Sequence, residues 1–293
     1  MIQVKSLTKK YSNGKGIFDV SFQVKKGEIF GFLGPNGAGK TTTMRHLMGF
    51  VNPTSGSASI AGLDCRTQAS EIQKKLGYVP GEIAFFDNMT GKQFLKFIAG
   101  MRGAHNNKRQ DSLIERFELE ADRKIRRMSK GMKQKVGLIA AFMHDPEVVI
   151  LDEPTSGLDP LMQKKFVELI QEERSRGKTI LMSSHIFGEI DSTCERVAII
   201  RDGRLVAVED ITTLKSSLEK RFYITFATTT DIAKIKASGL NYEIKDETKV
   251  EIVVTGNYNE MVKTLANCSL VSIDTSTQTL EEIFMRYYSK EGK

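Results

Sequence analysis

The chain contains 293 residues, of which 40% are hydrophobic and 27% are charged, and this balance excludes wholesale disorder and collagen-like repeats. The formal net charge of +7 arises before residue 218, because residues 218–293 hold ten basic and eleven acidic side chains. No apolar run approaches the roughly 20 residues of a membrane-spanning helix, and the first residues lack the apolar stretch of a signal peptide. These features predict a cytoplasmic protein. Its basic first part is compatible with nucleic acid, an anionic membrane surface, a polyphosphate or plain solvent.

The three cysteines, Cys65, Cys194 and Cys268, are odd in number, far apart and without a CxxC pair. Disulfides are rare in cytosolic proteins, and zinc sites usually contain closely spaced cysteine pairs. We therefore expect three reduced thiols and neither a structural disulfide nor a zinc site.

Up to residue 217 the sequence alternates strand-like and helix-like segments. Continuous apolar runs are typical of buried parallel strands, because both faces of such a sheet are covered. Strands are predicted at residues 29–33, 148–151, 179–184 and 197–200, and helices at 41–49, 132–144 and 161–176. This alternation predicts an α/β domain over residues 1–217.

Residues 83–145 break the alternation, because they show helical patterns and no buried strand. The helices are expected at 91–101, at 108–117 and after Ser129. We interpret this segment as a helical insertion between two strands of the sheet.

Residues 218–293 are predicted to form a small α+β domain of βαββαβ type. The expected order is a strand at 221–226, a helix at 231–237, a hairpin at 242–254, a helix at 259–266, a strand at 270–273 and a final helix at 280–288.

A glycine-rich motif follows the first predicted buried strand. The residues Gly34-Pro35-Asn36-Gly37-Ala38-Gly39-Lys40-Thr41 match the P-loop pattern GxxxxGK[ST], and Thr42 continues into the predicted helix. Such a loop cradles phosphates at a helix N-terminus. We expect Lys40 to reach the β- and γ-phosphates of a nucleotide, and the Thr41 hydroxyl to bind Mg²⁺.

Two adjacent carboxylates end the predicted strand at 148–151. Asp152 is expected to hold the metal, and Glu153 to activate or position the attacking water. Two carboxylates at the end of a buried strand are costly without such a role. A GTPase would contain an Asn-Lys-x-Asp motif that recognises guanine. The nearest match, at residues 107–111, has the wrong spacing, which disfavours a GTPase.

With these motifs, residues 2–215 resemble the nucleotide-binding subunit of ABC transporters. Met128-Ser129-Lys130-Gly131-Met132 stands where the family has its LSGGQ signature, and Ser156-Gly157-Leu158-Asp159 resembles the D-loop. His185 resembles the switch histidine, and Tyr11 stands where the family stacks an aromatic ring on adenine. Taken alone, either residue would more often be structural.

The resemblance implies ATP and Mg²⁺ as ligands and a head-to-tail dimer. In such a dimer the signature, Ser129 to Met132, faces the γ-phosphate bound by the opposite subunit, and His185 senses that phosphate. Since both halves of the site are present in one chain, we expect a homodimer.

The sequence departs from the family pattern in two places. Lys130 and Met132 replace a glycine and a glutamine of the signature, and Lys130 either adds charge near the phosphate or points to solvent. Gly81 stands where a metal-contacting glutamine is expected, and Glu82 is its substitute by proximity only. The following residues, Phe85 and Phe86, either fill the core of the helical insertion or line a groove for a membrane partner.

The resulting functional hypothesis is an ATPase subunit that powers a separate membrane permease, for export of a drug, peptide, lipid or ion. It would lie peripherally on the cytoplasmic face of the cell membrane, where much of the positive charge would face anionic lipid. The alternative is a soluble ABC-type ATPase that acts on nucleic acid or ribosomes. We expect no nucleic-acid partner, because the chain has one set of motifs and no coiled-coil segment.

Overall fold

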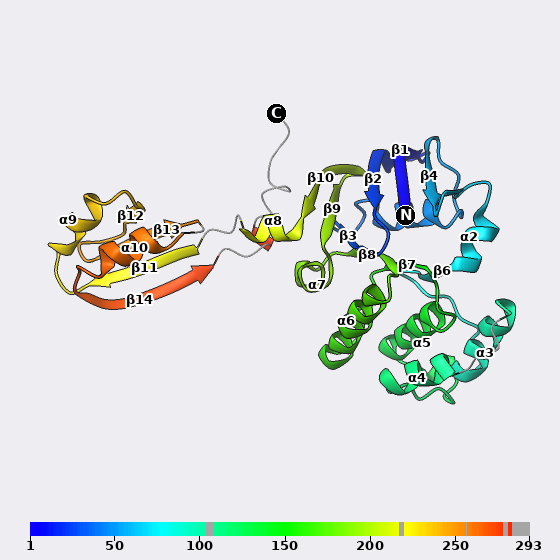
Figure 1. The fold of residues 1–293 in the computed structure, drawn as a ribbon. Helices are drawn as coiled ribbons and strands as arrows, with labels where there is room; N and C mark the ends of the chain where they lie inside the picture. Colours follow the sequence, from blue (N-terminus) through cyan, green and yellow to red (C-terminus); the bar gives the residue numbers. More distant parts are fainter. Residues whose placement is uncertain (104–107, 217–219, 256, 278–280, 283–293) are drawn as a thin grey trace. The chain divides into compact units, whose positions relative to one another are not determined.

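The computed structural model describes residues 1–103, 108–216, 220–255, 257–277 and 281–282 (Figure 1). The chain divides into two units, Met1–Glu209 and Asp210–Lys293. The division lies slightly before the boundary at residue 217 that composition suggests, and a short helix, α8 (Ile211–Ser216), occupies the interval.

A six-stranded sheet forms the centre of the first unit. Its strand order is β10-β9-β3-β8-β7-β6, and β9, β3, β8, β7 and β6 are joined by parallel pairing. The bounds are β3 (Ile29–Leu33), β6 (Leu76–Val79), β7 (Val148–Asp152), β8 (Thr179–Ser184), β9 (Arg196–Arg201) and β10 (Arg204–Asp210). The four predicted strands are thus confirmed as β3, β7, β8 and β9. Their parallel arrangement brings the loops after β3, β7 and β8 to one edge of the sheet, where α/β proteins bind ligands.

A second, antiparallel sheet was not predicted from the sequence. It has the order β2-β1-β4-β5, with β1 (Ile2–Lys10), β2 (Gly16–Val24), β4 (Ser55–Ile60) and β5 (Leu63–Asp64). Its alternation is obscured because the pairing of β1 shifts register twice against β2, and because β4 is mostly small, exposed residues. Helix α1 (Lys40–Leu47) contributes Met44 and Leu47 to a core that both sheets share.

The segment between β6 and β7 is helical, as predicted. It contains α3 (Gly91–Met101), α4 (Lys108–Arg116), a 3₁₀ turn at Ile125–Arg127 and α5 (Lys130–Phe142). Helix α3 begins with a capping box, in which Thr90 and Gln93 bond each other's backbone amides. Helix α5 packs against α3, α4 and β6, so it links the insertion to the sheet.

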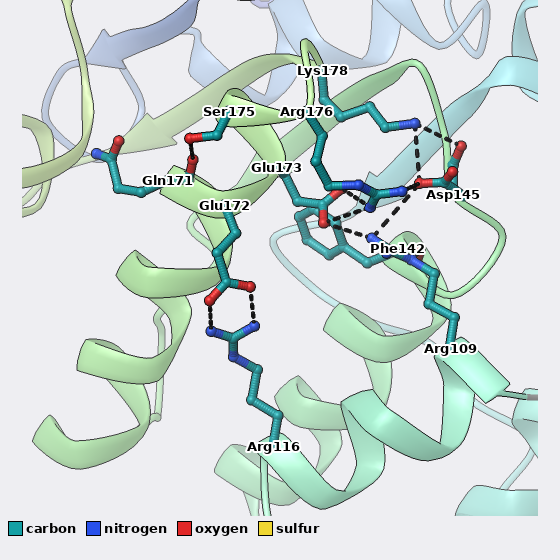
Figure 2. A network of polar contacts seen from close by, with 10 residues as sticks. All are labelled: Arg109, Arg116, Phe142, Asp145, Gln171, Glu172, Glu173, Ser175, Arg176 and Lys178. Atoms are coloured by element: carbon teal, nitrogen blue, oxygen red, sulfur yellow. Dashed lines mark hydrogen bonds and ion pairs between the residues drawn. The ribbon is translucent and has the colours of Figure 1, made fainter.

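Ion pairs fasten this helical insertion to α6 (Pro160–Ser175), as Figure 2 shows. The buried carboxylate of Glu173 accepts a hydrogen bond from Arg109 of α4 at 2.7 Å and one from Arg176 at 3.0 Å. Next to it, Arg116 holds Glu172 with two hydrogen bonds of 2.5 and 2.6 Å. Because α6 follows the D-loop segment, these pairs connect the insertion to the part of the chain that carries the candidate site.

The remaining helices of the first unit are α2 (Ala69–Lys75), before β6, and α7 (Phe187–Thr193), after β8. None of the helices in the described ranges combines the length and the apolar character needed to cross a membrane.

The second unit has the predicted βαββαβ order. Its elements are β11 (Lys220–Phe226), α9 (Asp231–Lys236), β12 (Asn241–Ile244), β13 (Lys249–Val254), α10 (Asn259–Leu265) and β14 (Leu270–Thr277). The sheet order β12-β13-β11-β14, with antiparallel neighbours throughout, is that of a ferredoxin-like domain. Both helices pack on one face, where Ile224, Ile235, Ile252 and Leu265 belong to one buried cluster. Of the predicted final helix at 280–288, only residues 281 and 282 lie within the described ranges.

Candidate nucleotide-binding site

The P-loop joins β3 to α1, and its conformation requires glycine at the start of the helix. Gly39 is the N-cap of α1 with φ of 110°, in the left-handed region that side chains disfavour. A Cβ at this position would also lie 2.6 Å from Cγ2 of Ile17, so space and backbone both exclude a larger residue. This turn places Lys40 at the first position of α1, beside the site.

Lys40 is buried and points back into its own loop. Its Nζ donates hydrogen bonds to the carbonyl oxygens of Gly34 and Pro35 at 2.7 and 3.2 Å. The same ammonium lies 3.2 Å from Oε1 of Glu153. A phosphate bound here would therefore compete with this carboxylate for Lys40.

Asp152, at the end of β7, meets the P-loop threonine. The Thr41 hydroxyl donates to Oδ2 of Asp152 at 2.7 Å, and the Ser183 hydroxyl donates to Oδ1 at 2.5 Å. Asp152 is 1% exposed, and among the described residues its hydrogen bonds come from hydroxyls instead of a cation. A hydroxyl and a buried carboxylate in contact form an oxygen pair that fits Mg²⁺, which usually takes few protein ligands and several waters or phosphates. No cluster of three or more His, Cys, Asp or Glu residues that could hold a metal occurs in the part of the chain described.

Glu153 has an unusual backbone and two basic neighbours. Its φ is 49°, a left-handed conformation that is rare outside glycine and is often found at functional sites. The neighbouring strand fixes this turn, because the Glu153 amide donates to Oγ of Ser183 at 3.1 Å. Oε1 lies 3.2 Å from Lys40 and 3.3 Å from Nδ1 of His185, which is 44% exposed after β8. The structure thus brings two other predicted residues, Lys40 and His185, to one carboxylate that still reaches solvent.

Gly81, which stands where the family pattern has a metal-contacting glutamine, lies beside Asp152. A Cβ at Gly81 would approach Oδ2 of Asp152 to 3.2 Å, so little space separates the loop from the carboxylate. Glu82 is exposed and lines two adjoining hollows, one shared with Thr41 and the other with Glu153. Within the described ranges no hydrogen bond joins Glu82 to Thr41 or Asp152, and its role at the metal stays a prediction.

The signature and D-loop residues cap two helices. Ser129 is the N-cap of α5 and accepts a hydrogen bond from the Met132 amide at 3.2 Å. Asp159 is the N-cap of α6 and accepts from the Met162 amide at 3.0 Å. No hydrogen bond or ion pair joins the signature to the P-loop in the described part of the chain. Its expected contact with a nucleotide held by another subunit stays a prediction.

Tyr11 lies in the turn between β1 and β2, with 38% of its surface exposed. The ammonium of Lys9 lies 5.6 Å from the centre of its ring. The turn leads into β2, whose Ile17 contacts the P-loop at Gly39. Adenine stacking on Tyr11 is compatible with this placement and stays a prediction.

Several polar residues of the site were missed by the sequence analysis. Ser183 binds both Asp152 and the amide of Glu153, and Ser184 donates to Glu189 at 2.6 Å. The hydroxyl of Thr155 bonds the other oxygen of Glu189. The sequence signal for these residues was the pair of serines at the end of the apolar run of β8. In the structure, Ser183 pairs with Asp152 of the parallel strand β7.

A P-loop after a buried strand, with a threonine–carboxylate pair and a neighbouring glutamate at the end of a parallel strand, defines a P-loop ATPase. The family model described as "ABC transporter" matches residues 17–156. The chain belongs to the family of ABC transporter ATP-binding proteins.

Three relatives illustrate this membership. An uncharacterized ABC transporter ATP-binding protein, YcbN of Bacillus subtilis, is 40% identical over 72% of this chain and 71% of its own length. The bacitracin transport ATP-binding protein BcrA of Bacillus licheniformis is 39% identical over 70% of this chain and 68% of its own. The uncharacterized ABC transporter ATP-binding protein YdbJ of Bacillus subtilis is 31% identical over 98% of this chain and 94% of its own, so the likeness extends to the second unit.

Solved structures agree with this result. The ATP-binding subunit of an ABC transporter superposes with a TM-score of 0.69 at 31% identity, covering 73% of this chain and 92% of that one. The dimeric structure of MJ0796, described as a bacterial ABC transporter cassette, gives a TM-score of 0.67 at 25% identity, covering 72% of this chain and 99% of that one.

Proposed function

We propose that this ATPase works as a nucleotide-sandwiched homodimer and drives a separate membrane permease that exports its cargo. The observation that carries the proposal is the meeting of Glu153 with Lys40 and His185 beside the Asp152–Thr41 pair. This arrangement offers a phosphate-binding ammonium, a metal-binding oxygen pair and a base at one edge of the sheet.

In the proposed reaction, each side chain acts on one part of the nucleotide. Lys40 leaves Glu153 and neutralises the β- and γ-phosphates. Thr41 and Asp152 would hold Mg²⁺, which neutralises charge that develops on the phosphates. Glu153 then accepts a proton from the attacking water. His185, within reach of the same carboxylate, contacts the γ-phosphate and responds when that group leaves.

The dimer follows from the placement of the signature. Ser129 and the first amides of α5 form a helix N-terminus of the kind that binds anions, and among the described residues no hydrogen bond or ion pair joins them to the P-loop of the same chain. The dimeric cassette among the structural relatives supports a second subunit as the source of the phosphate. ATP bound between two subunits would make closure depend on the nucleotide.

An aromatic surface on the helical insertion supports docking of a permease. Phe86 and Phe97 are 54% and 41% exposed, and their rings meet edge to face at 5.5 Å. Phe85 packs at 4.9 Å against the buried Phe94, so it serves the core while Phe86 presents its ring outside. Exposed, clustered aromatic rings are typical of protein contact sites. We assign this surface to a helix of the membrane partner, which would hold the chain at the cytoplasmic face of the membrane.

Export is the transport direction that the relatives favour, because the names of two of them refer to bacitracin transport and linearmycin resistance. The cargo proposed from these names is a drug, with a peptide, a lipid or an ion as the other classes, and it would be recognised by the permease.

The proposal is tested by assaying ATP hydrolysis of the purified chain with and without Mg²⁺, and by co-purification with multi-span membrane proteins. Lys40→Ala, prepared identically, serves as the control for contaminating ATPases. We expect Mg²⁺-dependent hydrolysis that this variant loses, and capture of a permease. Failure of the wild-type chain to hydrolyse ATP would refute the catalytic assignment. Capture of ribosomal or nucleic-acid complexes in place of a permease would refute the transport assignment.

A further inference from the structure

Lys130 occupies a signature position where the family pattern has glycine, and its side chain reaches the D-loop of the same chain. Nζ of Lys130 donates a hydrogen bond to Oγ of Ser156 at 2.7 Å. Lys130 is exposed and stands at the first position of α5. The sequence analysis left two alternatives for this lysine, charge near the phosphate or exposure to solvent, and did not predict this hydrogen bond.

Two further contacts join α5 to the same loop. A Cβ at Gly131 would lie 2.4 Å from the carbonyl oxygen of Gly157, so the two backbones touch at a position that only glycine allows. One helical turn later, the buried side chain of Gln134 donates to the carbonyl oxygen of Pro154 at 2.8 Å. Lys130, Gly131 and Gln134 thus face the segment Pro154–Gly157 together.

This segment begins directly after Glu153, so its position affects the carboxylate. Two turn hydrogen bonds shape the loop, from the Ser156 amide to the Glu153 carbonyl at 3.2 Å and from the Leu158 amide to the Thr155 carbonyl at 3.0 Å. Glu153 itself is in a left-handed conformation that its surroundings must maintain. A charged hydrogen bond to Ser156 helps to maintain it, since bonds to an ionised donor are stronger than neutral ones.

We propose that Lys130 is a positioning residue for ATP hydrolysis, acting through Ser156 on the loop that carries Glu153. In this way the signature of one chain and the catalytic glutamate of the same chain move as one body. The inference rests on the proposed catalytic role of Glu153. It predicts an effect on the catalytic step, because the hydrogen bond of Lys130 goes to the loop that follows Glu153.

The test is a double-mutant cycle on the full chain, with Lys130→Met, Ser156→Ala and their combination. We expect each single variant to lower kcat by about fivefold, as for loss of one exposed charged hydrogen bond. The KM for ATP should be unchanged. The double variant should be no worse than either single variant, because both remove the same bond. Lys130→Arg, which retains a charged donor, should recover most of the activity. Lys124→Met, which removes another exposed lysine of the same insertion, serves as the matched control.

Amide hydrogen exchange provides a readout that does not depend on activity. We expect faster exchange at Ser156 and Leu158 in both single variants, and wild-type exchange at these amides in the Lys124→Met control. Unchanged amide exchange in Lys130→Met would overturn the inference, whatever the ATPase activity of the chain. Absence of ATP hydrolysis by the wild-type chain would instead refute the proposed function. The inference would also be overturned if the kcat losses of the two single variants multiplied in the double variant, or if the KM for ATP rose in Lys130→Met alone. Either result would assign Lys130 to direct phosphate contact.

Discussion

Lys40 and Glu153 form an ion pair with Nζ and Oε1 3.2 Å apart, joining the P-loop to the loop after β7. Lys40 is 5% exposed and Glu153 25% exposed, so water screens the pair only in part. The pair keeps the carboxylate beside the ammonium that we propose to bind phosphate. A nucleotide that took over Lys40 would release Glu153 to act on water.

Replacing the carboxylate that we propose as the base should separate ATP binding from ATP hydrolysis. In Glu153→Gln the side chain keeps its size but loses the ability to accept a proton, so kcat should fall by about 10²–10⁴-fold. ATP binding should persist, because Lys40 and Thr41 remain. Since the nucleotide is no longer consumed, ATP should trap the dimer, which light scattering would detect. Hydrolysis at the wild-type rate would remove Glu153 from the mechanism.

The aromatic surface should matter for assembly more than for folding. Phe86→Ala is expected to weaken association with the permease by more than about tenfold, as loss of a central aromatic contact does. The melting temperature should change little, because the ring is 54% exposed. Val262→Ala, which shortens a 57% exposed apolar side chain in the second unit, provides the control. If Phe86→Ala were destabilised while its folded fraction still bound the permease normally, the ring would belong to the core and not to the docking surface.

The two adjacent glutamates of α6 should differ in their contribution to stability. Glu173→Gln removes a buried carboxylate shared by Arg109 and Arg176, and we expect a loss of about 2 kcal/mol. This is below the roughly 3–5 kcal/mol of a fully buried pair, because Arg176 is 43% exposed. Glu172→Gln breaks an exposed pair with Arg116 and should cost about 0–1 kcal/mol. Urea denaturation of both variants measures the difference, and equal losses would refute this interpretation of the network.

The stability of the first unit should decrease in mild acid through His144. Burial, together with the nearby positive charge of Arg102, lowers the pKa of this imidazole from 6.5 to about 4. Below pH 6.5 the unfolded chain takes up a proton that the folded chain binds only near pH 4, so stability is lost as the pH falls through this window.

His144→Gln removes this titration, and its free energy of unfolding should vary less between pH 6.5 and 4 than that of the wild type. Denaturation curves at several pH values provide the measurement. An equally steep pH dependence in both proteins would show that other groups are responsible.

Features that depend on local pattern could be predicted from the amino-acid sequence alone. Continuous apolar runs predicted the central parallel strands, the P-loop and the Asp152–Glu153 pair were visible as contiguous motifs, and strand and helix periodicity gave the order of the second unit. Such signals are local, because periodicity and backbone requirements act over a few residues.

Contacts between residues distant in the sequence became known from the three-dimensional fold. The register of β7 against β8 brings Ser183 to Asp152 and Glu153, and the packing of α5 on the D-loop gives Lys130 its partner Ser156. The antiparallel sheet of β1, β2, β4 and β5 was not predicted because β1 shifts register against both neighbours, β4 is partly exposed and β1 pairs with the distant β4. Long-range pairing and helix packing depend on the whole fold, so no local pattern could have specified these contacts.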